Sequence, residues 1–99
     1  MGRIQGLTEV YLTGDTLLKS EGAVEIFSIV IAGEGATAGQ RIVFRNGTTA
    51  AAPVLLPVVL DAANTTIPLQ FANGKRFENG CFVDFEGSAG KIHCSLTYK

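Results

Sequence analysis

The ten residues Ala23–Ala32, which read AVEIFSIVIA, are the strongest strand signal in the chain and decide its predicted fold. The six residues from Ile26 to Ile31 are rich in β-branched and aromatic side chains, and they are apolar on both faces of an extended strand. A strand of this kind is typically central in its sheet and covered on both faces. We therefore expect Ala23–Ala32 to lie at the centre of a β-structure.

Turn residues recur at short intervals on both sides of this segment, and no longer window shows the spacing of an amphipathic helix. The eight predicted strands are Glu9–Thr13, Thr16–Ser20, Ala23–Ala32, Gln40–Arg45, Pro53–Leu60, Thr65–Phe71, Cys81–Glu86 and Lys91–Tyr98. This pattern predicts an all-β domain, either a small antiparallel β-sandwich or a jelly-roll-like barrel of about eight strands. With 99 residues the chain is long enough for one domain only. We expect residues 1–16 to form an N-terminal arm with the first strand, and residues 17–99 to form the sandwich.

Proline and Asn-Gly pairs predict where strands end or stay unpaired. Prolines 53, 57 and 68 fall in two of the predicted strands, which we expect to be edge or bulged strands because proline donates no backbone hydrogen bond. The Asn-Gly pairs that begin at Asn46, Asn73 and Asn79 predict turns. The last two pairs bracket Lys75–Glu78, so that Phe77 is either a plug packed onto the end of the sandwich or an anchor for a partner.

The last two segments, Cys81–Glu86 and Lys91–Tyr98, alternate cleanly between apolar and polar residues, and we expect them to pair as a hairpin through Gly87–Gly90. Cys81 and Cys94 fall on the apolar faces of this hairpin. They are predicted to be two buried thiols that act as small hydrophobic side chains, with a bridge between the strands as the alternative. Two cysteines are too few for a disulfide framework or a structural zinc site.

His93, the sole histidine, is the only candidate for acid–base chemistry or metal binding. The hairpin predicts that it lies across from Asp84 and Glu86, and a neighbouring carboxylate can tune an imidazole for such a role. Alternating polar residues are equally typical of a solvated sheet face, and this group has no nucleophile. The sequence therefore predicts no enzymatic activity, no catalytic or metal-binding residues, and a His93→Ala variant with intact function.

The glycine-rich segment Gly33–Gly39 has the spacing G-x-G-x-x-x-G, which matches neither the dinucleotide-binding fingerprint nor a P-loop. It is predicted to be an inter-strand loop, and no cofactor is expected.

Charge excludes two classes of partner. The net charge is −1 and the eight Lys and Arg residues are scattered, so no basic patch for nucleic acid or for a membrane surface is expected. The N-terminus carries no apolar signal-peptide core. Charged residues make up only 17% of the chain, below the average of about 25%. This low fraction indicates either burial against copies of the chain or a larger assembly, or a surface that is polar without being charged.

From Leu17 to Tyr98 the chain resembles a loose group of short phage proteins found among virion structural components. The resemblance covers about four-fifths of the chain and rests mostly on turn glycines and strand alternation. The segments that carry it are Leu18–Val24 (LKSEGAV), Arg41–Thr48 (RIVFRNGT), Ile67–Leu69 (IPL), Gly74–Val83 (GKRFENGCFV) and Thr97–Tyr98.

The resemblance implies a small β-sandwich on a viral particle, such as a capsid decoration (cement) protein that binds and stabilises the major capsid shell. Its expected partners are the major capsid protein and further copies of itself, with a trimer as the guess by analogy. Its expected location is the capsid surface of a virion, after synthesis in the host cytoplasm. The contacts are expected in the arm Met1–Leu7 and the loops Gly33–Gly39 and Lys75–Asn79. The candidate partner-binding residues are Arg3, Ile4, Leu7, Glu34, Lys75, Arg76 and Phe77.

The alternative is a receptor- or glycan-binding β module of a tail, a fibre or a head–tail accessory protein. Such a module needs an exposed aromatic patch or an acidic loop, and Phe77 with Glu78 is the candidate that the sequence offers.

Overall fold

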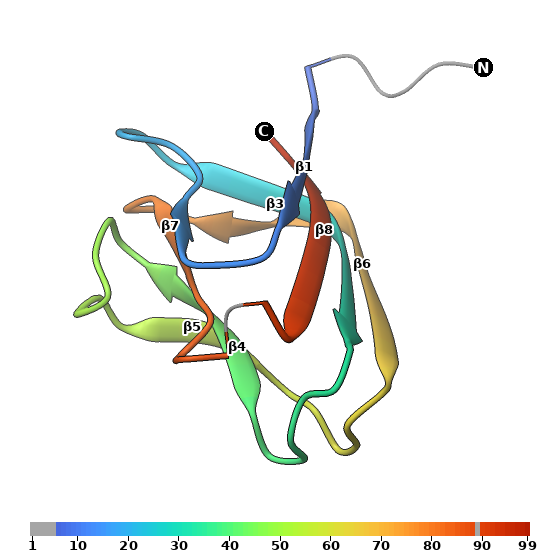
Figure 1. Cartoon of the computed structure of the whole chain (residues 1–99). Coiled ribbons are helices and arrows are strands. Elements are labelled where there is room, and N and C mark those ends of the chain that lie inside the picture. The colour runs from blue at the N-terminus through green and yellow to red at the C-terminus, as the bar shows by residue number, and fades with distance from the viewer. Residues whose placement is uncertain (1–5, 89) are drawn as a thin grey trace.

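A computed structural model describes residues 6–88 and 90–99 of the chain (Figure 1). Eight strands form two four-stranded antiparallel sheets, one in the order β1-β8-β3-β6 and one in the order β2-β7-β4-β5. The strands are β1 (Thr8–Leu12), β2 (Thr16–Leu17), β3 (Val24–Gly33), β4 (Arg41–Asn46), β5 (Val54–Val59), β6 (Thr66–Phe77), β7 (Cys81–Asp84) and β8 (Ile92–Tyr98). The predicted all-β sandwich is thus confirmed. Among the described residues, no helix is long and apolar enough to cross a membrane.

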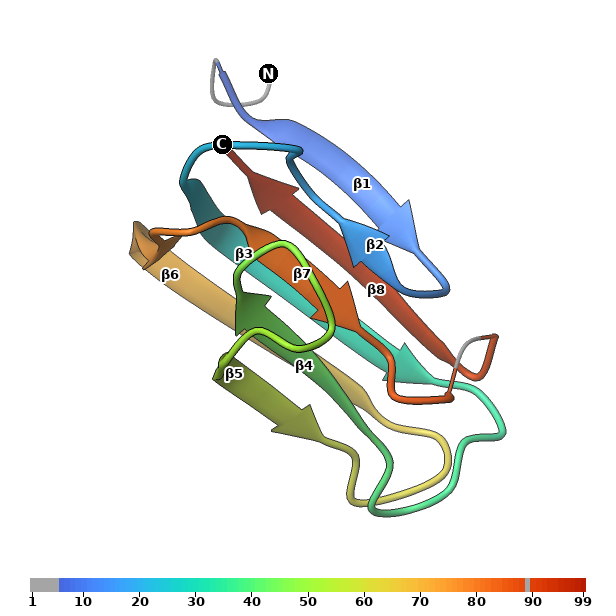
Figure 2. The same ribbon diagram turned by 90° about the vertical axis from the view of Figure 1, so that its left-hand side faces the viewer.

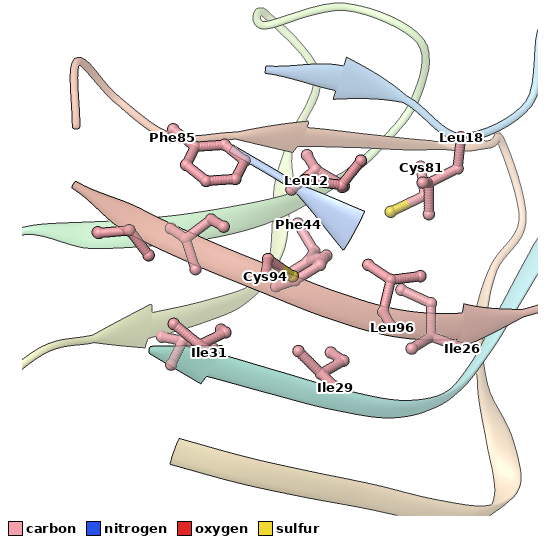
Figure 3. Close-up of a cluster of buried hydrophobic side chains, with 14 of the residues drawn as sticks. Leu12, Leu18, Ile26, Ile29, Ile31, Phe44, Cys81, Phe85, Cys94 and Leu96 are labelled. Atoms are coloured by element: carbon pink, nitrogen blue, oxygen red, sulfur yellow. The ribbon is translucent and has the colours of Figure 1, made fainter. Parts of the chain in front are cut away.

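The two sheets lie face to face, with β1 and β2 on one side of the sandwich and β5 and β6 on the opposite side (Figure 2). Alternate side chains from each sheet fill the space between them (Figure 3). Phe44, Phe77 and Phe85 are the largest side chains with no exposed surface, and isoleucines of β3, β4 and β8 pack around them. Because β1 is hydrogen-bonded to β8, the chain belongs to the sandwich from Thr8 onward.

The segment that decides the fold forms β3, which is central in its sheet between β8 and β6. The expectation that β3 is covered on both faces is wrong, because Val30 on its outer face is 43% exposed. Val30 points outward because β3 contains a β-bulge: the pairing of β3 with both of its neighbours shifts between Ile26 and Ser28. Phe27 is therefore an extra residue that reverses the alternation, so that Ile26 and Ile29 both point into the core. The two apolar faces in the sequence result from this change of phase.

Strand β6 is longer than predicted because Asn73-Gly74 does not end it. Ile26 pairs with Lys75 and Ser28 pairs with Gln70, so residues 71–74 form an excursion of β6 opposite the bulge at Phe27. Gly74 has a φ of +82°, and a Cβ added there would lie 3.1 Å from the Phe27 ring. Glycine is thus required both by the backbone conformation and by the ring beneath it.

The predicted hairpin between the last two segments is wrong. Strand β7 pairs with β2 and β4 in one sheet, whereas β8 pairs with β1 and β3 in the other. The chain thus changes sheets between β7 and β8, and buried side chains of both strands belong to one hydrophobic core. Cys81 and Cys94 are consequently buried on facing sheets, and both are free thiols (Figure 3).

The prediction that the proline-containing segments are edge strands is confirmed, since β5 and β6 each end one sheet. They lie on the same side of the sandwich (Figure 2).

Candidate functional site

The structure separates the candidate partner-binding residues. Leu7 precedes β1, and Lys75 and Arg76 end β6, so these three residues lie at one end of the sandwich, where β8 also ends. Glu34 follows β3 and lies at the opposite end. The described candidate residues thus lie at two opposite ends of the sandwich. Arg3 and Ile4 fall outside the described residues.

Phe77 has no exposed surface. It ends β6 opposite Val24 and belongs to the hydrophobic core, so the plug interpretation is confirmed and the anchor interpretation is wrong. Its apolar ring is buried because the excursion of β6 brings the strand back onto β3 before the Asn79-Gly80 turn.

The end of the sandwich that carries Arg76 is rich in charge. The Arg76 guanidinium lies between two carboxylates, with Nε 2.7 Å from Oε1 of Glu78 and Nη1 3.3 Å from Oε2 of Glu25. The hydrogen bond and the charge of Glu78, followed by those of Glu25, raise the pKa of Arg76 above its ordinary value. The pairs are exposed, so they orient Arg76 more than they stabilise the fold.

His93 lies on the outer face of the first sheet, not beside Asp84 and Glu86 as the hairpin predicted. Its ring stacks against Tyr11 of β1, with centroids 5.8 Å apart and an angle of 19° between the planes. The Tyr11 hydroxyl hydrogen-bonds to Nδ1, which accepts when the proton is on Nε2. Nε2 lies 3.1 Å from Oε1 of Glu34, but the carboxylate is not aligned to accept a hydrogen bond. His93 therefore holds the Tyr11 side chain in place.

Next to Tyr11, the outer face of this sheet has a shallow hollow of about 440 Å³. Ser95 pairs with Tyr11 on one side and with Val30 on the other, so its small side chain lies between two larger side chains on the same face of the sheet. Residues Ser28 and Thr97 extend the floor, and their hydroxyl groups lie 2.7 Å apart. The remaining lining residues are Glu9, Val10 and Leu96. The hollow thus combines an aromatic wall that is 63% exposed with a floor of hydroxyl groups.

Asp84 and Glu86 lie instead on the outer face of the second sheet, where they pair with arginines of β4. Nε of Arg45 lies 3.0 Å from Oδ2 of Asp84, and its Nη1 donates to the Ala52 carbonyl at 2.8 Å. Arg41 donates two hydrogen bonds to Glu86, of 2.7 and 3.0 Å. These side chains flank Val43, which has no exposed surface although it points away from the core. The carboxylates are therefore part of the structure of this face.

We expect Arg45→Met to lower the free energy of unfolding by about 2–4 kcal/mol, because it leaves the buried Asp84 carboxylate without its cationic partner. Urea unfolding followed by circular dichroism measures the loss. Arg45 lies between Asp84 and Glu86, whose Oε2 is 3.7 Å from Nη2 of Arg45. Arg76→Met is the matched control, since Arg76 also lies between two carboxylates but is half exposed. An equal loss in the two variants would contradict the assigned role of Arg45.

The side formed by β5 and β6 exposes apolar side chains, and we call it the β5–β6 side. On β5, Val54, Leu55 and Val59 are 38%, 40% and 54% exposed. Between the two strands, further side chains are only half-buried against the core, and these are Leu56, Ile67, Leu69 and Phe71. Of all charged residues in the chain, only Asp61 falls between residues 46 and 74, which contain β5 and the part of β6 that precedes Lys75 and Arg76. The exposed valines of β5 share the outer face of the second sheet with arginines of β4, because Val59 pairs with Arg41 and Val54 with Arg45. The β5–β6 side is thus an exposed apolar surface bordered by charged side chains.

Sequence reasoning missed both the hollow and the β5–β6 side. The hollow had no local signal, because its residues come from three strands. The β5–β6 side had one, namely the nearly charge-free segment 46–74, which the overall composition concealed. Within residues 6–88 and 90–99, no group of three or more His, Cys, Asp or Glu side chains is placed to hold a metal ion.

Comparison of the chain with protein-family models, with curated proteins and with solved structures finds no match. The fold assignment therefore rests on the strand order and register. The functional candidates are the charged end around Arg76, the hollow beside Tyr11 and the β5–β6 side.

Proposed function

We propose that this chain is a non-enzymatic structural protein of a phage virion, namely a capsid decoration (cement) protein that binds and stabilises the major capsid shell. The observation that carries the proposal is the β5–β6 side, an exposed apolar surface on a small rigid sandwich. Proteins seldom leave contiguous apolar surface in water unless it contacts another molecule. The resemblance to short virion proteins supports the particle as the place where this contact is made.

The charged end of the sandwich supplies a second surface for such a role. Leu7, Lys75 and Arg76 lie there, beside the point at which the N-terminal arm enters β1. A decoration protein needs only modest affinity at each contact, because many copies on a symmetric shell act together through effective concentration. An apolar side and a charged end on one rigid body allow each copy to contact both a neighbour and the shell.

Purified protein should bind expanded or emptied capsids of the phage that encodes it, in many copies per particle, as measured by co-sedimentation and electron cryomicroscopy. A doubly substituted Lys75→Glu/Arg76→Glu variant should lose binding, because it reverses the charge of the end assigned to the shell. His93→Ala should bind as the wild type does. No binding by the wild type, together with unchanged particle stability after deletion of the gene, would rule out the decoration role.

The hollow beside Tyr11 favours a second candidate, a glycan-binding module of a tail or fibre. Proteins bind neutral sugars through an aromatic face that contacts the C–H groups of the sugar, and through hydroxyl or carboxylate groups that form hydrogen bonds with the sugar hydroxyl groups. Tyr11 supplies the ring, while Ser28, Ser95 and Glu9 supply the polar groups. This role predicts glycan-array binding that Tyr11→Ala abolishes and Lys75→Glu/Arg76→Glu leaves intact, with few copies of the protein located at the tail.

A further inference from the structure

We infer that the outer face of the first sheet binds a linear neutral oligosaccharide, which lies across all four strands from Tyr11 on β1 to Gln70 on β6. The inference rests on the second candidate function, because it names the ligand of the hollow beside Tyr11 and extends the site beyond the hollow. The four strands lie side by side in the order β1-β8-β3-β6 (Figure 2). A ligand that contacts all of them therefore runs across the strands.

The strand register places polar side chains in one row across this face. Thr97 of β8 pairs with Glu9 of β1 on one side and with Ser28 of β3 on the other. Ser28 in turn pairs with Gln70 of β6. Leu96, which precedes Thr97, is buried in the core, so the side chains of the row point outward. We call Glu9, Thr97, Ser28 and Gln70 the polar row.

A second row lies next to the polar row, two residues away on each strand, and it offers a surface for C–H groups. Ser95 pairs with Tyr11 and with Val30, and Val30 pairs with Pro68 of β6. Tyr11 and Val30 are 63% and 43% exposed, and Pro68 is exposed as well. Sugar units that lie over the two rows thus contact apolar side chains in one row and form hydrogen bonds with the other.

The hydrogen-bonding groups of the polar row match hydroxyl groups, which both donate and accept. The Glu9 carboxylate only accepts, whereas the Gln70 amide offers an acceptor oxygen and two donor hydrogens. The hydroxyl oxygens of Ser28 and Thr97 lie 2.7 Å apart, so one hydroxyl donates to the other and the accepting hydroxyl keeps its own proton for a ligand. The row therefore requires donors above β1, and both donors and acceptors above the other strands. Sugar hydroxyl groups meet this requirement at every position.

The charge on the two rows favours a neutral ligand. Among the residues of both rows, Glu9 alone is charged. A sulfated or sialylated glycan would bring a negative charge close to the Glu9 carboxylate, and neither row contains a Lys or Arg residue to offset it. The carboxylate thus serves both as an acceptor for sugar hydroxyl groups and as a barrier to anionic sugars.

The width of the sheet sets the length of the ligand. Neighbouring strands lie about 4.8 Å apart, so the three spacings from Glu9 on β1 to Gln70 on β6 amount to about 14 Å. One hexose unit of an extended glycan is about as long as one strand spacing. A linear chain of about three units therefore reaches from the Tyr11 ring to β6.

The end of the site at Tyr11 is held in place before a ligand binds. The ring of His93 stacks with that of Tyr11, and the Tyr11 hydroxyl is hydrogen-bonded to Nδ1 of His93. The hydrogen bond between Ser28 and Thr97 fixes the floor in the same way. Ordering of side chains is one of the costs of binding, and here the fold has already met that cost. The first sugar unit is therefore expected to bind at the Tyr11 end.

A glycan array with neutral, sulfated and sialylated glycans of one to six units tests the site, followed by calorimetric titration of the best-bound neutral series. The trimer of that series should bind at least about 10-fold more tightly than the monomer, with little gain beyond four units. Glu9→Gln should raise the affinity for sulfated glycans by about fivefold or more, because it removes the like charge and keeps a hydrogen-bonding group. Neutral glycans should bind to this variant as they bind to the wild type.

Two matched substitutions on β6 locate the far end of the site. Gln70→Ala should weaken binding of the trimer by about fivefold or more and leave binding of the dimer unchanged, because only the longer chain reaches β6. Thr66→Ala is the control, since Thr66 is an exposed residue on the same face of β6 but lies outside both rows. It should bind both lengths as the wild type does. Equal unfolding midpoints confirm that the variants are folded.

The outcomes separate this inference from the functions proposed above. Tyr11-dependent binding with equal affinity for the monomer and the trimer, or a preference for sulfated or sialylated glycans, would overturn the inference and leave a glycan-binding module standing. No binding to any neutral glycan would reject both of these and leave the decoration role to the capsid-binding experiment. Loss of capsid binding in Tyr11→Ala would assign this face to the capsid shell and also overturn the inference.

Discussion

Phe77→Ala is expected to lower the free energy of unfolding by about 3–5 kcal/mol. Phe77 is among the largest side chains with no exposed surface, and its removal leaves a cavity where β6 packs back onto β3. A domain of this size is stable by only about 5–15 kcal/mol, so the variant should be partly or fully unfolded at physiological temperature. Thermal and urea unfolding, followed by circular dichroism, measure the effect.

Phe82→Ala is the control for this prediction, because Phe82 is an aromatic residue of β7 that points away from the core and is only half-buried. It should lose much less stability than Phe77→Ala. Phe77→Leu should retain most of the stability, since it keeps an apolar side chain in the site. A folded Phe77→Ala variant of normal stability that loses only partner binding would restore the anchor interpretation.

The second large effect is a loss of stability in alkali. Burial raises the pKa of both thiols to about 12, and the charge of Cys94 adds to the shift at Cys81. A thiol in the unfolded chain ionises near the ordinary cysteine pKa of 9.0, so between pH 9 and pH 12 the folded state binds more protons than the unfolded state. Stability is therefore fully present below pH 9 and falls as the pH rises. We expect a loss of about 2 kcal/mol per cysteine between pH 9 and pH 11.

Urea unfolding at several pH values measures this loss, and a Cys81→Ala/Cys94→Ala variant is the reference. Between pH 9 and pH 11 the wild type should lose about 4 kcal/mol more than the variant does. Alkylation of the thiols at pH 8 should also occur only as fast as the protein opens, because neither thiol is exposed. Rapid alkylation of the folded protein, or equal losses in alkali, would contradict the buried and protonated state of the two cysteines.

The sequence by itself determined the local structure. Each of the eight predicted strands corresponds to a strand of the structure, although β6 runs on to Phe77 and β2 ends at Leu17, because the alternation of side chains and the turn residues act over a few neighbouring positions. The edge positions of β5 and β6 were also predictable, since a proline without an N–H group is excluded from the centre of a sheet. The two cysteines were predicted as buried thiols on the same basis, from their apolar-facing positions.

Only the tertiary structure decided which strands pair. Cys81–Glu86 and Lys91–Tyr98 alternate in the same way whether they pair side by side or face each other across the core, so the sequence pattern could not separate a hairpin from a crossing between sheets. Because β8 pairs with β1 and not with β7, His93 lies against Tyr11 and is not a neighbour of Asp84 and Glu86. The bulge at Phe27 likewise depends on the excursion of β6 that lies opposite it. Ala23–Ala32 therefore identified the central strand, whereas packing against distant segments decided which of its side chains are buried.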